Sequence, residues 1–172
     1  KAITIRSSQL GWQDYDPLDI TYSLRSAINQ AIQKKKKTEF EIESIGITTD
    51  GHSCMIWDSE TGAPLTPAVP GTCIRAKNII SKLVRDGLNQ QVKSSTGLNL
   101  LPTYIGPKIK WFMESIPDLY YKGVKDQLMV GGIDSWILYN LTGRKLFKTD
   151  CTHAAQSMLY DIHEFEWDSF LV

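Results

Sequence analysis

Two short apolar runs on either side of an Asp-Gly pair constrain this chain more than any other stretch. The first run lies within residues 42–47 and the second extends from Cys54 to Trp57, with Asp50 and Gly51 between them. Glycine adopts a positive φ without a Cβ clash, so Asp-Gly commonly joins antiparallel strands. The pattern predicts a hairpin over residues 41–58 whose polar tip lies at the edge of a sheet, where open α/β sheets bind ligands.

Length and composition indicate an ordinary cytoplasmic protein of one domain. Its 172 residues suit a single domain, which at this size buries about 70% of the surface of the unfolded chain. The 19 basic and 19 acidic residues cancel, so no net charge favours nucleic acid or a membrane surface. The three cysteines are scattered, without metal spacing or a disulfide framework, which favours free thiols in the cytoplasm. No apolar stretch approaches the length of a membrane span, and no signal segment opens the chain. The sequence is compatible with a homo-oligomer.

Periodic patterns elsewhere predict helices that alternate with strands. Asp16-Pro17 suits the first turn of a helix, and the basic run Lys34–Lys37 suits its end. The apolar stripe of this helix includes Ile20 and Ile32. Further helices are predicted over residues 75–88, 107–116, 118–127, 134–141, 152–159 and 166–172, and short strands at residues 2–6 and 128–130. The alternation predicts an α/β fold with helices packed against a sheet.

Several segments keep the order and approximate spacing of segments in one known family. They are Gly11-Trp12 with Asp16-Pro17, residues 45–65, residues 95–98 with 108–111, residues 132–143, and Thr149-Asp150 with Ala154 and Met158-Leu159. Together they resemble the N-terminal lobe of FGGY-type carbohydrate kinases, most nearly that of the glycerol kinases. The resemblance implies an α/β, ribonuclease-H-like (actin-like ATPase) lobe, with a mixed sheet and flanking helices, incomplete at both ends. Residues 1–172 would then form a single domain, most of the sugar-binding lobe, with the nucleotide lobe absent.

The resemblance also implies an activity and its cofactors. Enzymes of this family transfer the terminal phosphoryl group of ATP, with magnesium, to a sugar or polyol hydroxyl. The family's phosphate loop should precede residue 1 and its catalytic aspartate should follow residue 172, so the chain alone is expected to be inactive and to bind neither cofactor. Asp50, Asp134 and Asp150 lie in matching segments, but none matches the family's catalytic base, and Asp134 is expected to cap a helix. No catalytic or metal-binding residue is therefore assigned.

Five residues are candidates for binding the sugar or polyol substrate, namely Asp50, Gly51, His52, Arg75 and Tyr104. Gly51 and His52 replace an Arg-Glu pair of the glycerol kinases, and His52 resembles the histidine of xylulose and gluconate kinases. Arg75 is what remains of a Trp-Gln-Asp-x-Arg segment, and Tyr104 lies one residue from the position of a tyrosine that contacts glycerol. Asp50 and His52 are two residues apart, so an extended backbone would direct both side chains to one side. We therefore expect Asp50, His52 and Arg75 to share the ligand cleft.

Two functions fit these residues. The first is a sugar kinase that prefers a sugar or sugar acid over glycerol, since the charged partners of glycerol are replaced. The second is a non-catalytic, pseudokinase-like binding module, because the family's usual side chains are lost at residues 51 and 71 and fold does not fix function. A solvated turn at residues 50–52 and a buried structural Tyr104 would explain the same sequence without any ligand.

Overall fold

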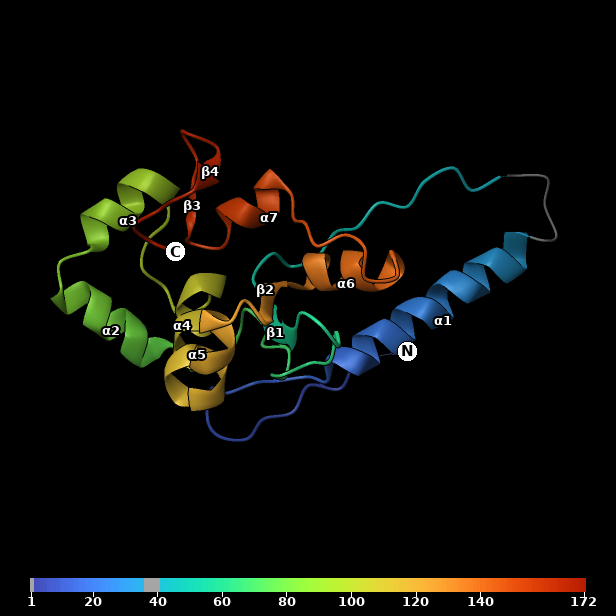
Figure 1. Cartoon of the computed structure of the whole chain (residues 1–172), viewed down its shortest axis with the longest axis horizontal. Helices are drawn as coiled ribbons and strands as arrows, with labels where there is room; N and C mark the ends of the chain where they lie inside the picture. The colour runs from blue at the N-terminus through green and yellow to red at the C-terminus, as the bar shows by residue number, and fades with distance from the viewer. Residues whose placement is uncertain (1, 36–40) are drawn as a thin grey trace.

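The structure is a computed structural model and describes residues 2–35 and 41–172. Its helices are α1 (Pro17–Lys35), α2 (Lys77–Arg85), α3 (Asn89–Thr96), α4 (Ile105–Ser115), α5 (Pro117–Val124), α6 (Ile133–Leu141) and α7 (Cys151–Ala155). Its strands are β1 (Cys54–Asp58), β2 (Leu128–Gly132), β3 (Tyr160–Asp161) and β4 (Glu166–Trp167). Figure 1 shows β1 and β2 near the middle, with α2 to α5 on one side and α6 and α1 on the other.

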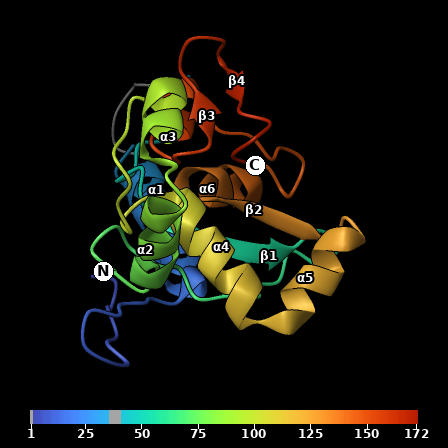
Figure 2. The same ribbon diagram turned by 90° about the vertical axis from the view of Figure 1, so that its left-hand side faces the viewer.

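The centre of the fold is the antiparallel pair of β1 and β2, which lie side by side in Figure 2. Cys54 lies opposite Gly132 and Asp58 opposite Leu128. The other edge of β1 contacts the segment that follows it, through isolated bridges that include Cys54 with Val69. Because β1 has neighbours on both edges and helices over both faces, all five of its residues are buried, which explains its nearly continuous apolar run.

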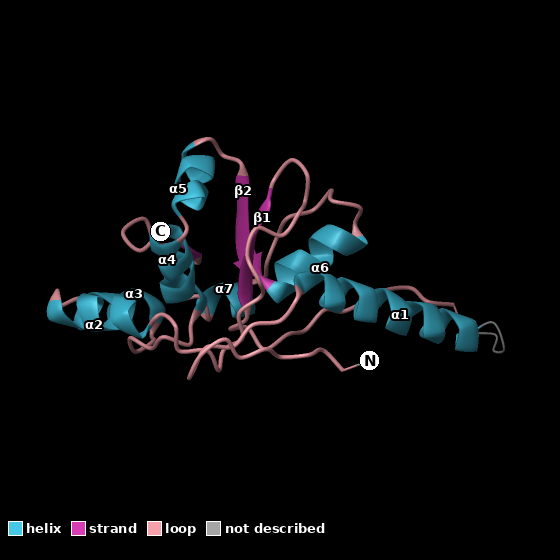
Figure 3. Cartoon of the chain, turned by 90° about the horizontal axis from the view of Figure 1, so that it is seen from below, coloured by secondary structure: helices cyan, strands magenta, loops and turns pink. Residues whose placement is uncertain are grey.

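The side chains of β1 alternate between two hydrophobic clusters. Met55 and Trp57 face the cluster that α1 and α6 complete, and Ile56 faces the cluster that α4 and α5 complete. Figure 3 shows these two pairs of helices on opposite sides of the strands. The rings of Trp57 and Trp136 meet edge to face with centroids 5.3 Å apart, and the Trp136 indole donates a hydrogen bond to Thr21 of α1. The strand pair therefore holds the start of α1 and the whole of α6 on one face.

The predicted hairpin over residues 41–58 is wrong. Residues 41–50, which the structure describes, form no strand, and β1 instead pairs with β2 and with the segment after Asp58. The reversal takes place at Thr61-Gly62, where the Asp58 carboxylate accepts hydrogen bonds from the Thr61 amide and hydroxyl. A turn signal predicts a local chain reversal but not the partner of each strand, because strand pairing depends on packing across the whole domain.

The helix predictions are largely confirmed, although α7 ends at Ala155, four residues before the predicted end at residue 159. Residues 166–172 form β4 and a turn in place of the predicted helix, and residues 2–6 contribute an isolated bridge from Arg6 to Asp14 in place of a strand. The apolar stripe of α1 is buried at Ile20, but Ile32 is 39% exposed because the second half of α1 extends away from the other helices in Figure 1. Residues 36 and 37 of the predicted lysine end lie outside the described residues.

The predicted mixed sheet also differs from what is observed. The strands in the part of the chain that the structure describes form two separate antiparallel pairs, β1 with β2 and β3 with β4.

None of the helices in the described ranges combines the length and hydropathy that crossing a membrane requires.

Candidate functional site

The 49–53 loop, which leads into β1, carries three of the predicted site residues. Gly51 has φ +68° and is buried, and a Cβ at this position would clash with the side-chain amide of Gln156. The Asp50 carboxylate accepts hydrogen bonds from the amides of His52 (3.2 Å) and Ser53 (2.9 Å) and from the Ser53 hydroxyl (2.6 Å). Burial opposes ionisation of Asp50, but these hydrogen bonds outweigh it and hold its pKa below the usual value. Asp50 therefore shapes the loop as a carboxylate.

His52 and Tyr104 lie against each other. The two rings meet edge to face with centroids 5.2 Å apart. Tyr104 immediately precedes α4, while His52 comes from the loop, so the contact joins two elements that are distant in sequence. A Cβ on Gly71 would lie 2.8 Å from the His52 Cβ, which is closer than two carbons approach without a shift. The absence of a side chain at residue 71 therefore provides the room for His52.

Lys108, a buried lysine that was not among the predicted site residues, binds the backbone on which His52 is carried. Lys108 of α4 is 0% exposed, and its ammonium donates hydrogen bonds to the carbonyls of His52 (2.8 Å) and Pro70 (3.0 Å). Burial lowers the pKa of Lys108, while the nearby Cys54 and Asp50 oppose that shift. The cation thus joins the 49–53 loop to the segment containing Gly71. Its spacing in the sequence indicates this burial, because Lys108 lies three residues after Ile105 and four before Phe112, on the apolar face of the helix.

A second support comes from α7. The Thr49 hydroxyl lies 3.0 Å from Nε2 of His153, and Nδ1 of the same ring lies 3.1 Å from both carboxylate oxygens of Asp150. Asp150 also accepts the His153 amide at 2.9 Å and so caps α7. These hydrogen bonds from His153 lower the pKa of the Asp150 carboxyl. The 49–53 loop is therefore held between α4 and α7.

Arg75 lies in a neighbouring buried network and not against the His52 ring. It is 5% exposed, and its guanidinium donates to the Asp14 carboxylate (3.0 Å) and the Gln13 carbonyl (3.0 Å). The guanidinium carbon lies 5.0 and 5.1 Å from the ring centroids of Trp12 and Trp111, within the range of cation–π attraction. A direct contact between Arg75 and a ligand stays a prediction, and this burial favours a supporting role.

Asp134 does not cap α6, contrary to the sequence prediction. The cap position is occupied by Gly132, and Asp134 lies in the first turn of the helix. Its buried carboxylate accepts hydrogen bonds from the hydroxyls of Thr149 (2.6 Å) and Ser135 (3.4 Å). An anion in the first turn is favoured by the helix dipole, so Asp134 both stabilises α6 and holds Thr149 against it.

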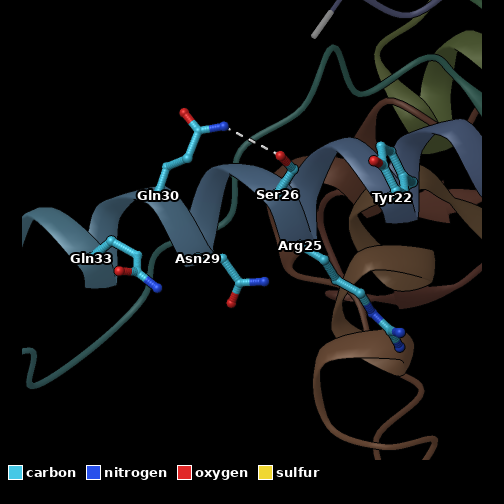
Figure 4. A pocket seen from close by; sticks show the side chains of 6 residues that line it. All are labelled: Tyr22, Arg25, Ser26, Asn29, Gln30 and Gln33. Atoms are coloured by element: carbon cyan, nitrogen blue, oxygen red, sulfur yellow. Dashed lines mark hydrogen bonds between the residues drawn. The ribbon is translucent and has the colours of Figure 1, made fainter.

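Two surface hollows lie elsewhere. One, of about 380 Å³, is shown in Figure 4 and is lined by Tyr22, Arg25, Ser26, Asn29, Gln30 and Gln33 of α1. The other, of about 310 Å³, is lined by Arg6, Asp14, Tyr15, Asp16, Pro17, Pro64, Thr66 and Pro67. Neither includes His52 or Tyr104. Within residues 2–35 and 41–172, no three His, Cys, Asp or Glu side chains are arranged to hold a metal ion.

Burial of Cys54 beside Lys108 predicts a loss of stability in alkali. Burial raises the pKa of the Cys54 thiol from 9.0 to about 11. The folded chain therefore keeps a proton that the unfolded chain releases, so this stability is fully present below pH 9 and is lost as pH rises to 11. Two pKa units at about 1.4 kcal/mol each give a loss of about 2–3 kcal/mol.

This loss is to be measured as a difference between two proteins. The lowered pKa of Lys108 acts in the opposite direction, and burial raises the pKa of Tyr15 to about 12, so both contribute to the background slope. Urea unfolding of the reduced wild type and of Cys54→Ala, from pH 8 to 11, separates the thiol from that background. We expect a flatter profile for Cys54→Ala, and equal slopes would contradict the assignment.

Comparison with known proteins decides the family. Residues 1–172 match the model of the N-terminal domain of the FGGY family of carbohydrate kinases. The chain belongs to this family. It is 36% identical over 160 residues to the glycerol kinase of Limosilactobacillus reuteri (strain DSM 20016), covering 93% of the chain and 32% of that protein. The glycerol kinase of Pseudomonas savastanoi pv. phaseolicola is 35% identical, with the same coverage. The chain thus spans about a third of the length of the curated relatives it matches.

Solved structures agree with this assignment. The Plasmodium falciparum glycerol kinase with ADP superimposes with a TM-score of 0.95 at 27% identity, covering 99% of this chain and 34% of that one. A ligand-bound xylulose kinase from Lactobacillus acidophilus, at 23% identity and a TM-score of 0.86, covers 99% of this chain and 33% of that one, and shows the shared fold. The predicted actin-like fold is confirmed at this level.

Proposed function

We propose that the intact protein is an ATP-dependent kinase that phosphorylates a hydroxyl of a sugar or sugar acid, and that this chain binds the acceptor. The observation that carries the proposal is the contact of His52 with Tyr104 over Gly71, in an FGGY N-terminal domain. Membership of the family and the glycerol kinase relatives support the reaction class. The residues at positions 51, 52 and 71, which are Gly, His and Gly, support an acceptor other than glycerol.

The site offers an imidazole and a phenol where the resemblance implies an arginine and a glutamate. The imidazole of His52 and the phenol of Tyr104 both donate and accept hydrogen bonds, as a sugar hydroxyl does. Gly51 presents no side chain in place of an arginine, so a short polyol has no guanidinium to bind. Sites built around particular hydroxyl contacts reject analogues that leave those contacts unpaired. This composition favours a longer acceptor.

ATP and magnesium are proposed to bind parts of the protein beyond this domain. Among the described residues, no three His, Cys, Asp or Glu side chains are grouped to hold a metal ion, and no step through ATP or magnesium is assigned to them. Phosphoryl transfer depends mainly on positioning and on charge stabilisation around the phosphates. The contribution of this chain is to hold and orient the acceptor hydroxyl through the 49–53 loop and Tyr104.

Substrate preference tests the proposal. In a coupled assay of ADP release by the intact protein with ATP and magnesium, we expect kcat/KM for xylulose or gluconate to exceed that for glycerol about tenfold or more. The 172-residue chain assayed alone supplies the background and is expected to show none. Faster turnover of glycerol would contradict the preference, and binding of a sugar without turnover of any substrate would identify a non-catalytic binding module.

A further inference from the structure

A series of hydrogen bonds runs from α7 to the backbone of the 49–53 loop. It begins at the Asp150 carboxylate, passes through both ring nitrogens of His153 and reaches the Thr49 hydroxyl, 3.0 Å from Nε2. The same hydroxyl accepts the amide of Gly51 at 3.4 Å. Gly51 immediately precedes His52, whose ring contacts Tyr104. Four polar groups from two distant parts of the chain therefore end at the residue next to the candidate substrate contact.

The carboxylate at one end of this series fixes the direction of its first hydrogen bond. A carboxylate only accepts, so Nδ1 of His153 carries the proton and donates it to Asp150. In the neutral ring Nε2 then accepts the Thr49 hydroxyl, and the free lone pairs of that oxygen accept the Gly51 amide. His153 is 8% exposed, so water has little access to its ring, although the Asp150 side chain is 61% exposed.

The backbone of the 49–53 loop is held at several separate points. Gly51 has φ +68°, and the side chain of Gln156, which follows α7, lies against it. Lys108 of α4 holds the carbonyl of His52, and the Asp50 carboxylate holds the amides of His52 and Ser53, so neither of them holds the Gly51 amide. The amide of Gly51 therefore depends on Thr49, and Thr49 depends on His153.

We propose that His153 is a positioning residue for substrate binding, which fixes the 49–53 loop through Thr49 and so sets the direction of His52. The proposal rests on the proposed function, because the ligand of His52 is the sugar or sugar acid named there. His153 lies behind the loop, against Thr49, and acts on the acceptor only through that residue.

Matched variants separate the two ends of the imidazole. Glutamine places its amide about where Nε2 lies and keeps the contact with Thr49, whereas asparagine reaches only as far as Nδ1 and loses it. In the intact protein we expect His153→Asn and Thr49→Val each to raise KM for the sugar about fivefold to tenfold with kcat within about twofold. His153→Gln and Thr49→Ser should stay within about twofold of the wild type. The double variant His153→Asn/Thr49→Val should match either single variant, since both remove one interaction.

Amide hydrogen exchange gives a readout that does not depend on catalysis. In the intact protein, exchange at Gly51 and His52 should be faster in His153→Asn and unchanged in His153→Gln. If the wild type turns over none of the sugars, the proposed function fails while the exchange comparison still tests the anchor. A wild-type KM in His153→Asn, or unchanged exchange, would overturn the proposal. Thr49→Val provides the same test if His153→Asn does not fold.

Discussion

Replacing Arg75 with methionine is expected to lower the free energy of unfolding by about 3–5 kcal/mol. The Arg75 side chain is 3% exposed and its partner Asp14 is 21% exposed, so the variant leaves a carboxylate without its buried cation. The Gln13 carbonyl also loses its donor, and the attraction of the guanidinium to two tryptophan rings disappears. Methionine fills a similar volume, so the loss measures the charge and its hydrogen bonds more than a cavity. Urea unfolding at neutral pH gives the value.

Two further variants make this result interpretable. Lys77→Met removes an exposed cation two residues away and should change stability by less than about 0.5 kcal/mol. Arg75→Met/Asp14→Asn should recover part of the loss, because the unpaired carboxylate is removed together with its partner. If Arg75→Met folds as stably as the wild type but binds sugar more weakly in the intact protein, Arg75 is a direct ligand contact, as the sequence predicted.

Helices were predictable because their signals are local. The cap at Asp16-Pro17 and the 3.6-residue period that follows it lie within one segment, and α1 begins at Pro17. The same holds for α6, where the prediction missed only the cap, because Gly132 takes that position and Asp134 bonds to Thr149 instead. Periodicity specifies which face of a helix is apolar, but burial depends on what packs there. For that reason Ile20 is buried while Ile32 is exposed.

Strand pairing was not predictable from the same information. The Asp50-Gly51 turn signal predicts a hairpin, but no strand precedes it within residues 41–50, which the structure describes. Instead, Gly51 has a positive φ and lies against the side chain of Gln156, and the Asp50 carboxylate accepts hydrogen bonds from amides of its own loop. The partner of β1 is β2, which lies far along the chain. No local pattern in either strand specifies the other, because register is fixed by the faces that both bury.

The residues of the candidate site divide in the same way, into those with a local sequence signal and those placed by long-range contacts. The resemblance directed attention to His52 and Tyr104, and the structure brings their rings together. Lys108 and His153 were missed because each contacts the loop across a long separation in sequence, 56 residues for Lys108 with His52 and 104 for His153 with Thr49. A lysine on a buried helix face was a usable signal. A histidine three residues after a capping aspartate was a weaker one.

Replacing His52 with alanine is expected to weaken sugar binding by the intact protein about 5- to 150-fold, which corresponds to about 1–3 kcal/mol. The ring is half-buried against Tyr104, so a ligand hydroxyl paired with it would lose its partner in a site with restricted water. The backbone carbonyl that binds Lys108 remains in the variant, so the loop keeps its support from α4. Stability should therefore change much less than affinity.

Calorimetric titration of the intact protein with xylulose and gluconate measures this effect, with two controls that isolate the ring. His52→Gln retains a donor and an acceptor at similar reach and should restore part of the affinity. Gly71→Ala leaves His52 in place chemically but adds a Cβ 2.8 Å from its own, so the ring must shift. We expect Gly71→Ala to weaken binding in the wild type and to have little effect in His52→Gly, because glycine at residue 52 lacks both the Cβ and the ring atoms that the added methyl group would meet. Unchanged affinity in His52→Ala, or a Gly71→Ala effect that persists in His52→Gly, would show that the acceptor is bound elsewhere.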